Sequence, residues 1–251
     1  MGVDGFTPPC APAPYPGRHA PEDREEAAIL LRLMDQSSQL TRDAMAGLVT
    51  LARRRPSLRQ PLASRPEFTA EDARALYGYG SPELRRRMAI RFRLNEAAIH
   101  ARLMITVHRL ADLWRRGRVQ EQEALADHLA ARDAISPLLL VQAMRNGRNG
   151  VFEVLFARFA GLDREAVDLL IDEAGSDAFA VVAKALGFTK PTFATLFLLA
   201  RGARPGDKRV DPHELARVLQ RFDRINRVEA EAWLADWQAD ARELAAYLAL
   251  S

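Results

Sequence analysis

The sequence predicts an all-α protein, and three observations support this. Between residues 22 and 249, apolar residues recur at spacings of three and four, and no period-two alternation lies between hairpin turns. Capping side chains precede prolines at helix starts, as in Ser81-Pro82 and Ser136-Pro137. Glycines follow apolar runs where helices end.

These signals place the elements in order along the chain. The first 21 residues hold six of the fourteen prolines and are predicted to form a disordered tail. Helices are then predicted at 22–36, 41–54, 69–77, 82–93, 96–116, 119–132, 137–145, 150–160, 164–173, 177–186, 190–201, 212–222 and 226–249. Expected caps are Ser81, Ser136 and Asp211, and Thr69 followed by Glu71 and Asp72 indicates an acidic first turn. Expected stops are Gly117, Gly161, Gly187 and Gly202.

One internal similarity suggests how these helices pack. The segment from Leu155 to Asp163 resembles the segment from Val181 to Thr189, since each has an apolar helix end, a basic residue, a glycine and a cap. Stacked helical hairpins build superhelical arrays. We therefore expect a repeat-like, HEAT-like array that ends in one long carboxy-terminal helix. The expected organisation is a tail (1–21), a basic helical half (22–135) and a repeat-like half (136–251).

Composition excludes several classes of protein. A single cysteine, Cys10, can neither close a disulfide within the chain nor build a cysteine zinc site, so a reducing cytoplasm is expected. No apolar run approaches the ~20 residues that span a bilayer. The tail lacks the basic head and apolar core of a signal peptide.

Charge is unevenly distributed along the chain. Residues 53–118 carry 16 basic and 6 acidic side chains, whereas residues 119–177 carry 5 basic and 11 acidic ones. This basic block either faces an anionic partner or docks onto the acidic block that follows.

The basic block supplies the candidates for binding an anion or a nucleic acid. They are Arg85, Arg86, Arg87, Arg91, Arg93, Arg115 and Arg116, together with Arg145 and Arg148 from the loop 145–150, where two glycines precede a helix start. Nucleic-acid modules interleave aromatic residues with basic ones, and that pattern is absent here. A solvated arginine face is therefore the expected alternative.

Aromatic residues near the end of the chain are the candidates for a protein interface. Trp233, Trp237, Leu244 and Leu248 fall on one stripe of the predicted last helix. They either cover the end of the helical core or anchor a second subunit, so a homodimer stays open.

Catalytic and metal sites are not expected. His100 and His108 lie eight residues apart, which does not suit a shared metal ion. His213-Glu214 resembles a phosphoacceptor box, but a helix start explains the same residues. The carboxylates of Asp172, Glu173 and Asp177 fit a turn, and no hydrolase, zincin or dinucleotide-binding motif occurs. No cofactor is predicted.

Residues 136–202 resemble a bacterial helical family known as domain of unknown function 2336. The resemblance is carried by apolar and glycine positions at 138–143, Gly147, 151–153, 157–161, 169–172, Gly175, 183–187 and 193–201, with Phe152-Glu153 and Asp172 as its most distinctive residues. It implies a cytoplasmic all-helical protein of unknown activity and transfers no catalytic residue.

We therefore expect a non-enzymatic cytoplasmic protein, an adaptor or regulator whose helical surface binds another protein. The alternative is a protein that binds nucleic acid or another anionic ligand through the basic block.

Overall fold

The computed structural model describes residues 21–35, 37, 39–146, 149–171, 176–202 and 211–250. Every regular element in these ranges is a helix, which confirms the all-α prediction. The helices are α1 (Pro21–Met34), α2 (Arg42–Arg54), α3 (Pro56–Ser64), α4 (Ala70–Tyr77), α5 (Pro82–Phe92), α6 (Glu96–Arg115), α7 (Val119–Ala131), α8 (Pro137–Arg145), α9 (Asn149–Ala160), α10 (Arg164–Ile171), α11 (Ser176–Ala185), α12 (Lys190–Gly202), α13 (Pro212–Arg224), α14 (Arg227–Ala239) and α15 (Ala241–Leu250). The tail predicted over residues 1–21 lies outside the described residues, except for its last residue.

Local signals in the sequence set most of the helix boundaries. Ser81 and Asp211 each accept a hydrogen bond from a backbone N–H in the first turn of the helix that follows. Thr69 and Asp72 form a reciprocal capping box at the start of α4. The predicted stops Gly117, Gly161 and Gly187 have φ angles of 68°, 67° and 70°, the left-handed conformation that ends a helix.

The sequence did not predict α3. Arg55 is at once the residue that ends α2 and the residue before α3, and Pro61 lies inside α3. A proline there removes a backbone donor and normally breaks a helix. The short helix persists because Leu58 and Leu62 are fully buried on its inner face, and this tertiary burial outweighs the local signal.

The prediction of one long helix over 226–249 is wrong. Asp240 adopts an extended conformation, with φ −145° and ψ 110°, and separates α14 from α15. Its Oδ1 accepts the backbone N–H of Arg242 at 2.9 Å and so caps the second helix. The chain turns at this residue and brings the ring of Tyr247 to 5.0 Å from that of Trp233.

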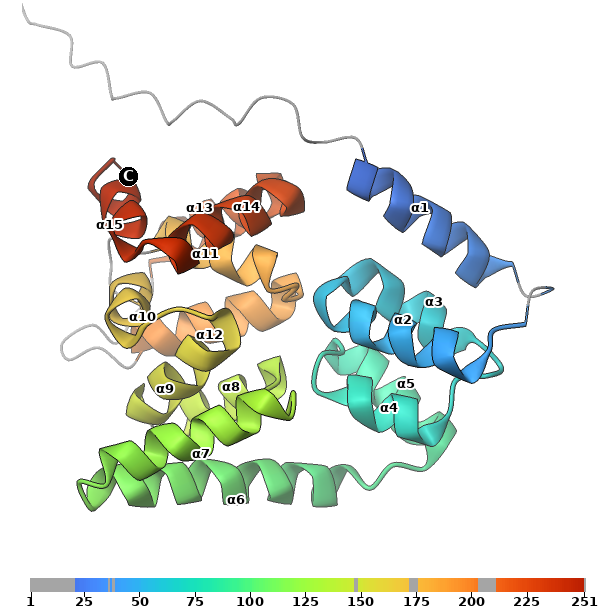
Figure 1. The fold of residues 1–251 in the computed structure, drawn as a ribbon, viewed down its shortest axis with the longest axis horizontal. Helices are drawn as coiled ribbons and strands as arrows, with labels where there is room; N and C mark the ends of the chain where they lie inside the picture. The colour runs from blue at the N-terminus through green and yellow to red at the C-terminus, as the bar shows by residue number, and fades with distance from the viewer. Residues whose placement is uncertain are drawn as a thin grey trace, which may run out of the picture.

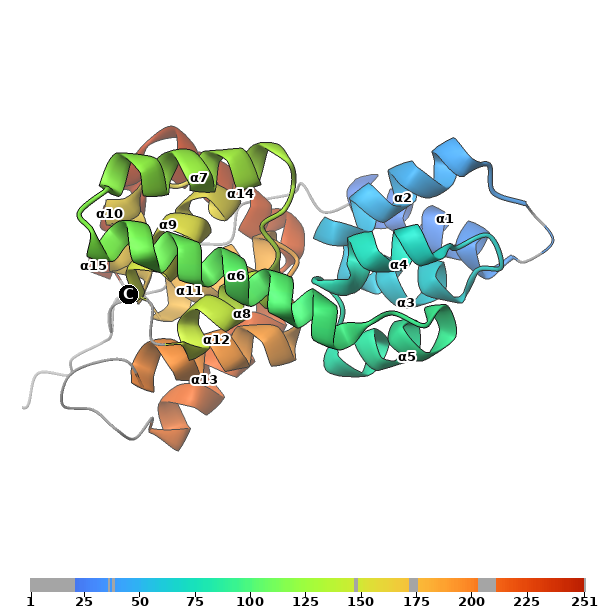
Figure 2. The ribbon, with the colours of Figure 1, turned by 90° about the horizontal axis from the view of Figure 1, so that it is seen from below.

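The buried side chains form two hydrophobic clusters. One lies in α1–α5 and the turns between them, with Leu138 added from α8, and the other draws on α6 to α15. We call these sets of helices the amino-terminal and carboxy-terminal groups; Figure 2 shows them side by side, with α6 leading from α5 into the second. Leu103 and Phe159 pack against both clusters. The groups are defined by packing, and the halves 22–135 and 136–251 stay predictions.

The superhelical array is not confirmed. In such an array each hairpin contacts only its neighbours, whereas α11 contacts α10, α12, α13, α14 and α15, and α8 packs against α12 (Figure 1). The two similar segments do share a way of ending a helix. The N–H of Leu162 donates to Ala157 and that of Phe188 to Ala183, each past a left-handed glycine. None of the described helices has the length and apolar content needed to cross a membrane.

Candidate functional site

Five predicted anion-binding residues lie on α5 or at its end, with different surroundings. Arg86 and Arg93 are exposed. Arg87 pairs with Glu83 at 3.3 Å, one turn earlier on the same helix. Arg91 donates hydrogen bonds to backbone carbonyls of the neighbouring segment. Arg85 is half-buried beside the Tyr77 ring, and burial lowers its pKa.

The other predicted anion-binding residues are scattered. Arg115 and Arg116 lie at the far end of α6, whose 20 residues make it about 30 Å long. Arg145 and Arg85 line a cavity of about 100 Å³, which is smaller than a typical ligand pocket. Arg148 lies outside the described residues. The structure therefore does not gather these arginines into one surface.

The proposed interface residues pack inside the chain. Trp237 and Leu244 are buried, and Trp233 and Leu248 are half-buried against the carboxy-terminal cluster. The ring of Tyr247 lies 5.0 Å from Trp233 and 5.3 Å from Trp237. These residues pack against the core, and Trp233 and Leu248 keep part of their surface exposed, so an interface here stays a prediction.

The histidines and paired carboxylates do not form a site among the described residues. His100 is half-buried, and His108 and His213 are exposed. Asp172 and Glu173 lie outside the described residues, while Asp177 pairs with Arg217 at 3.1 Å. In the ranges that the structure describes, no three histidine, cysteine or acidic residues gather as metal ligands.

Two larger cavities are lined by described residues, and the first is an apolar groove of about 320 Å³ between α3 and α5. Its lining residues are Gln60, Ala63, Ser64, Leu84, Arg87, Met88, Ile90, Arg91 and Phe92. Leu84 and Met88 are buried in its floor, whereas Ile90 on its rim is 74% exposed.

Arginines bridge this groove from one helix to the other. Arg87 donates to the Gln60 side chain at 3.3 Å. Arg91 donates to the backbone carbonyls of Ala63 and Arg65, and its guanidinium lies 4.8 Å from the Phe92 ring. The groove therefore has an apolar floor and a positively charged rim.

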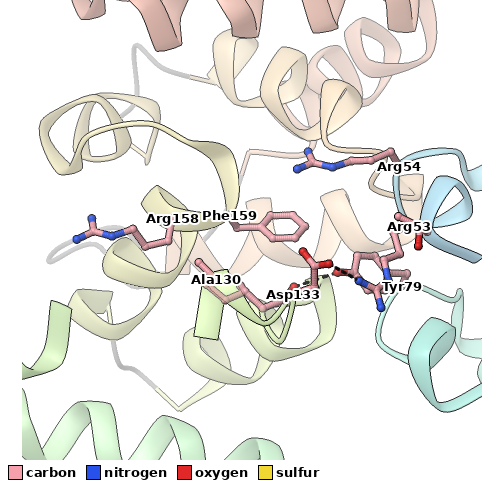
Figure 3. A pocket seen from close by; sticks show the side chains of 9 residues that line it. Arg53, Arg54, Tyr79, Ala130, Asp133, Arg158 and Phe159 are labelled. Atoms are coloured by element: carbon pink, nitrogen blue, oxygen red, sulfur yellow. Dashed lines mark hydrogen bonds and ion pairs between the residues drawn. The ribbon is translucent and has the colours of Figure 1, made fainter. Parts of the chain in front are cut away.

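The second cavity, the junction pocket, has a volume of about 310 Å³ and lies where the two groups meet (Figure 3). Its lining residues are Thr50, Arg53 and Arg54 from α2, Tyr79 after α4, Ala130 from α7, Asp133 and Ile135 after α7, and Arg158 and Phe159 from α9. Four segments that are distant in sequence thus contribute to one cavity.

Positive charge exceeds negative charge around the junction pocket. Arg53 pairs with Asp133 at 3.0 Å, and Arg158 pairs with Asp127. The Arg54 guanidinium lies 5.5 Å from the centre of the Phe159 ring, and among the described residues no carboxylate pairs with it. Arg54 is thus an exposed arginine that pairs with no carboxylate of the described residues.

A tyrosine and an aspartate complete the pocket walls. Tyr79 donates its hydroxyl to the Ile135 carbonyl at 3.1 Å, and burial raises the pKa of this phenol. Asp133 has a φ of 50°, in the left-handed conformation where glycine is favoured. Arg93 has the same φ after α5, so in both places the left-handed residue ends a helix.

Arg59 fixes the backbone beneath the pocket. Its side chain is 2% exposed and donates at 2.7–2.8 Å to four backbone carbonyls: those of Ala52 and Arg53 at the end of α2, of Tyr79, and of Gly187. Burial lowers the pKa of Arg59 to about 10, so it remains charged at neutral pH. The negative end of the α2 dipole stabilises that charge.

Gly187 holds the same segment from the other side. Its φ is 70°, and a Cβ atom on this residue would lie 2.3 Å from the Arg54 carbonyl oxygen. The turn after α11 therefore packs directly against the end of α2. Arg53 and Arg54 leave this fixed segment toward the pocket.

Comparison with known proteins adds a family. The family model described as "Uncharacterised protein conserved in bacteria (DUF2336)" matches residues 21–235. The chain belongs to this family. No curated protein and no solved structure matches it.

The DUF2336 match confirms the resemblance and extends it. The sequence placed the likeness in residues 136–202, whereas the match also covers all of the amino-terminal group and most of α14. Both the apolar groove and the junction pocket lie within the matched region.

Sequence reasoning missed most of the residues in the junction pocket. The basic block 53–118 includes Arg53 and Arg54, but no role was predicted for Asp133, Arg158 or Phe159. No local pattern joins positions that far apart. Asp133 carried one signal, because it stands directly after a helix, at a position where a glycine is usual.

Proposed function

We propose that this protein is a non-enzymatic cytoplasmic adaptor that regulates a partner protein by binding one of its helices in the apolar groove. One observation carries the proposal: a groove with a buried apolar floor, an exposed isoleucine on its rim and arginines around it. Amphipathic helices bind such grooves through apolar side chains spaced three and four apart.

Charge narrows the class of partner. Arg86 and Arg87 are exposed on α5 one turn before Ile90, and the exposed Arg93 follows the end of the helix. A helix with an apolar stripe flanked by glutamate or aspartate would pair with these arginines at the rim while its stripe fills the floor. Rim charges speed association and select partners more than they add affinity.

The test is photo-crosslinking in bacterial cells that produce the full chain. A benzophenone amino acid replaces Ile90 in one variant and Ile105 in a matched control. Ile105 is also an exposed isoleucine on a helix, 59% exposed, but it lies on α6 away from the groove. We expect position 90, and not position 105, to crosslink to one recurring acidic amphipathic segment.

A synthetic peptide of that segment then measures affinity by fluorescence anisotropy. Ile90→Glu should weaken binding at least tenfold, because it places a charge in the apolar contact. Ile105→Glu should leave binding unchanged. Equal crosslinking at both positions, or a captured segment without an apolar stripe, contradicts the proposal. Capture of a second copy of this chain contradicts it as well and indicates self-association.

A further inference from the structure

We propose that the junction pocket binds a small ligand bearing a phosphate group, held by Arg54 and Arg53. Arginine guanidinium groups match phosphate oxygens in geometry and remain charged at any physiological pH. The pocket lies at the lower end of the volume range of small-molecule sites, so it admits a phosphate with a group about the size of a nucleoside.

Arg54 is the principal anchor. Its guanidinium lies over the Phe159 ring, and among the described residues it has no carboxylate partner. The ring holds the guanidinium in place without using its N–H donors. All of these donors therefore remain available to an anion.

Arg53 offers a second donor. Its Nη1 is bound to Asp133, but its Nε is buried and has no hydrogen-bond acceptor among the described residues. A buried N–H without an acceptor costs free energy, and a phosphate oxygen in the pocket would relieve that cost.

The Asp133 carboxylate already pairs with Arg53 in the pocket. Its side chain is 73% exposed and reaches Arg53 from a left-handed turn held by two hydrogen bonds, Asp133 N–H to Ala130 and Ala134 N–H to Leu129. This carboxylate competes with a phosphate for Arg53. A ligand would displace it toward solvent, which is a small movement for an exposed side chain.

The backbone of Arg53 and Arg54 is held in place by contacts with other segments. Arg59 donates to the Arg53 carbonyl at 2.8 Å, and the Gly187 turn packs against the Arg54 carbonyl. A fixed backbone lowers the entropy lost when side chains close on a ligand. The site therefore depends on contact between the amino-terminal and carboxy-terminal groups.

Isothermal titration of the full chain tests the site, with inorganic pyrophosphate and adenosine monophosphate as probes at constant ionic strength. We expect Arg54→Gln to weaken binding of both probes at least tenfold. Asp133→Asn should tighten it about three- to tenfold, because asparagine keeps the size and the left-handed turn but no longer competes for Arg53. A purely structural role for Asp133 would not raise affinity.

Arg116→Gln is the matched control, because it removes an exposed arginine at the far end of α6. It should leave the affinity unchanged. Tighter binding of adenosine monophosphate than of pyrophosphate would indicate that the aromatic side chains of the pocket contact the adenine base. Equal affinity for the two probes would indicate that the pocket recognises phosphate alone. Equal losses in Arg54→Gln and Arg116→Gln, or unchanged affinity in Asp133→Asn, overturn the proposal. So does tighter binding of a single-stranded oligothymidylate that Arg54→Gln does not affect.

Discussion

The amino-terminal and carboxy-terminal groups are both helical, yet different side chains hold their interiors together. In the carboxy-terminal group, phenylalanine rings form a continuous series through the core: Phe156 lies 5.7 Å from Phe179, which lies 5.6 Å from Phe193. Its buried arginine, Arg201, pairs with the carboxylate of Glu214.

The smaller cluster of the amino-terminal group is completed by arginines bound to backbone carbonyls. Arg59 donates to four carbonyls, and the buried Arg65 donates to that of Asp35 at 2.7 Å as well as to Glu67. A group with few large apolar side chains gains rigidity by satisfying the orphan carbonyls at its helix ends. We therefore expect the amino-terminal group to be the less stable of the two, and more sensitive to loss of a single polar side chain.

The largest expected effect is that of Arg59→Met. Four carbonyls would lose their donor, and each orphaned buried acceptor costs about 1–3 kcal/mol, partly offset because no guanidinium is then buried. We expect a loss of about 3–5 kcal/mol in the free energy of unfolding, measured by urea denaturation. Far-UV circular dichroism should show helix loss before tryptophan emission changes, since Trp114, Trp233 and Trp237 all lie in the carboxy-terminal group.

An exposed arginine of the same group supplies the control for this experiment. Arg86→Met should change stability by no more than about 0.5 kcal/mol. Coincident transitions by both probes in Arg59→Met would show that the groups unfold as one unit and would remove the distinction drawn between them.

Gly187→Ala tests the contact between the groups. The left-handed conformation costs about 1–2 kcal/mol for alanine, and the new Cβ would force the Arg54 backbone away at a further cost of about 1–3 kcal/mol. Gly117→Ala is the matched control, because Gly117 has nearly the same φ but nothing within 4 Å of an added Cβ. The difference between the two melting temperatures measures the contact, and equal losses would show that it contributes nothing.

A smaller effect is expected from acid. Hydrogen bonds from Arg65, with a further one from the Leu40 backbone, lower the pKa of Glu67 to about 2 from its usual 4.5. The folded state therefore favours the ionised carboxylate. This contribution to stability is complete above pH 4.5 and is lost as the pH falls toward 2.

In an acid titration, helix content should decrease before tryptophan emission changes. Glu67→Gln should be less stable than the wild type at pH 7 and should show a shallower dependence on pH between 4.5 and 2. An unchanged slope would mean that other carboxylates set the acid sensitivity. Asp72 is the next candidate: burial would raise its pKa, but hydrogen bonds from Arg42 and Thr69 outweigh burial and lower it.

Local chemistry made most of the fold predictable. Capping residues before prolines and glycines after apolar runs placed helix boundaries to within a few residues, because these signals act within one turn. The break at Asp240 was not predicted because Trp233 and Trp237 before it and Leu244 and Leu248 after it continue the helical spacing. The helix that contains Pro61 was not predicted because its stability comes from burial of residues such as Leu58 against other helices.

For the groove and the junction pocket, the sequence predicted only that arginines are abundant, not which partners they bind. The sequence contained the basic block, but whether an arginine binds a carbonyl, a carboxylate or solvent depends on which helix ends lie beside it. Nothing in the polar surroundings of Arg59, between Ser57 and Gln60, indicates that its side chain is buried. Arg54 and Phe159 meet only because the two groups pack together.

The hydrogen bond between Arg59 and Gly187 also has a consequence for synthesis. The two residues are separated by 128 positions, and a ribosome adds about 5–20 residues per second. Gly187, one of the four acceptors of Arg59, is therefore synthesised roughly 6 to 25 seconds after Arg59. During that interval the amino-terminal group lacks one of the contacts that complete it, so it reaches its final structure only after Gly187 has been made.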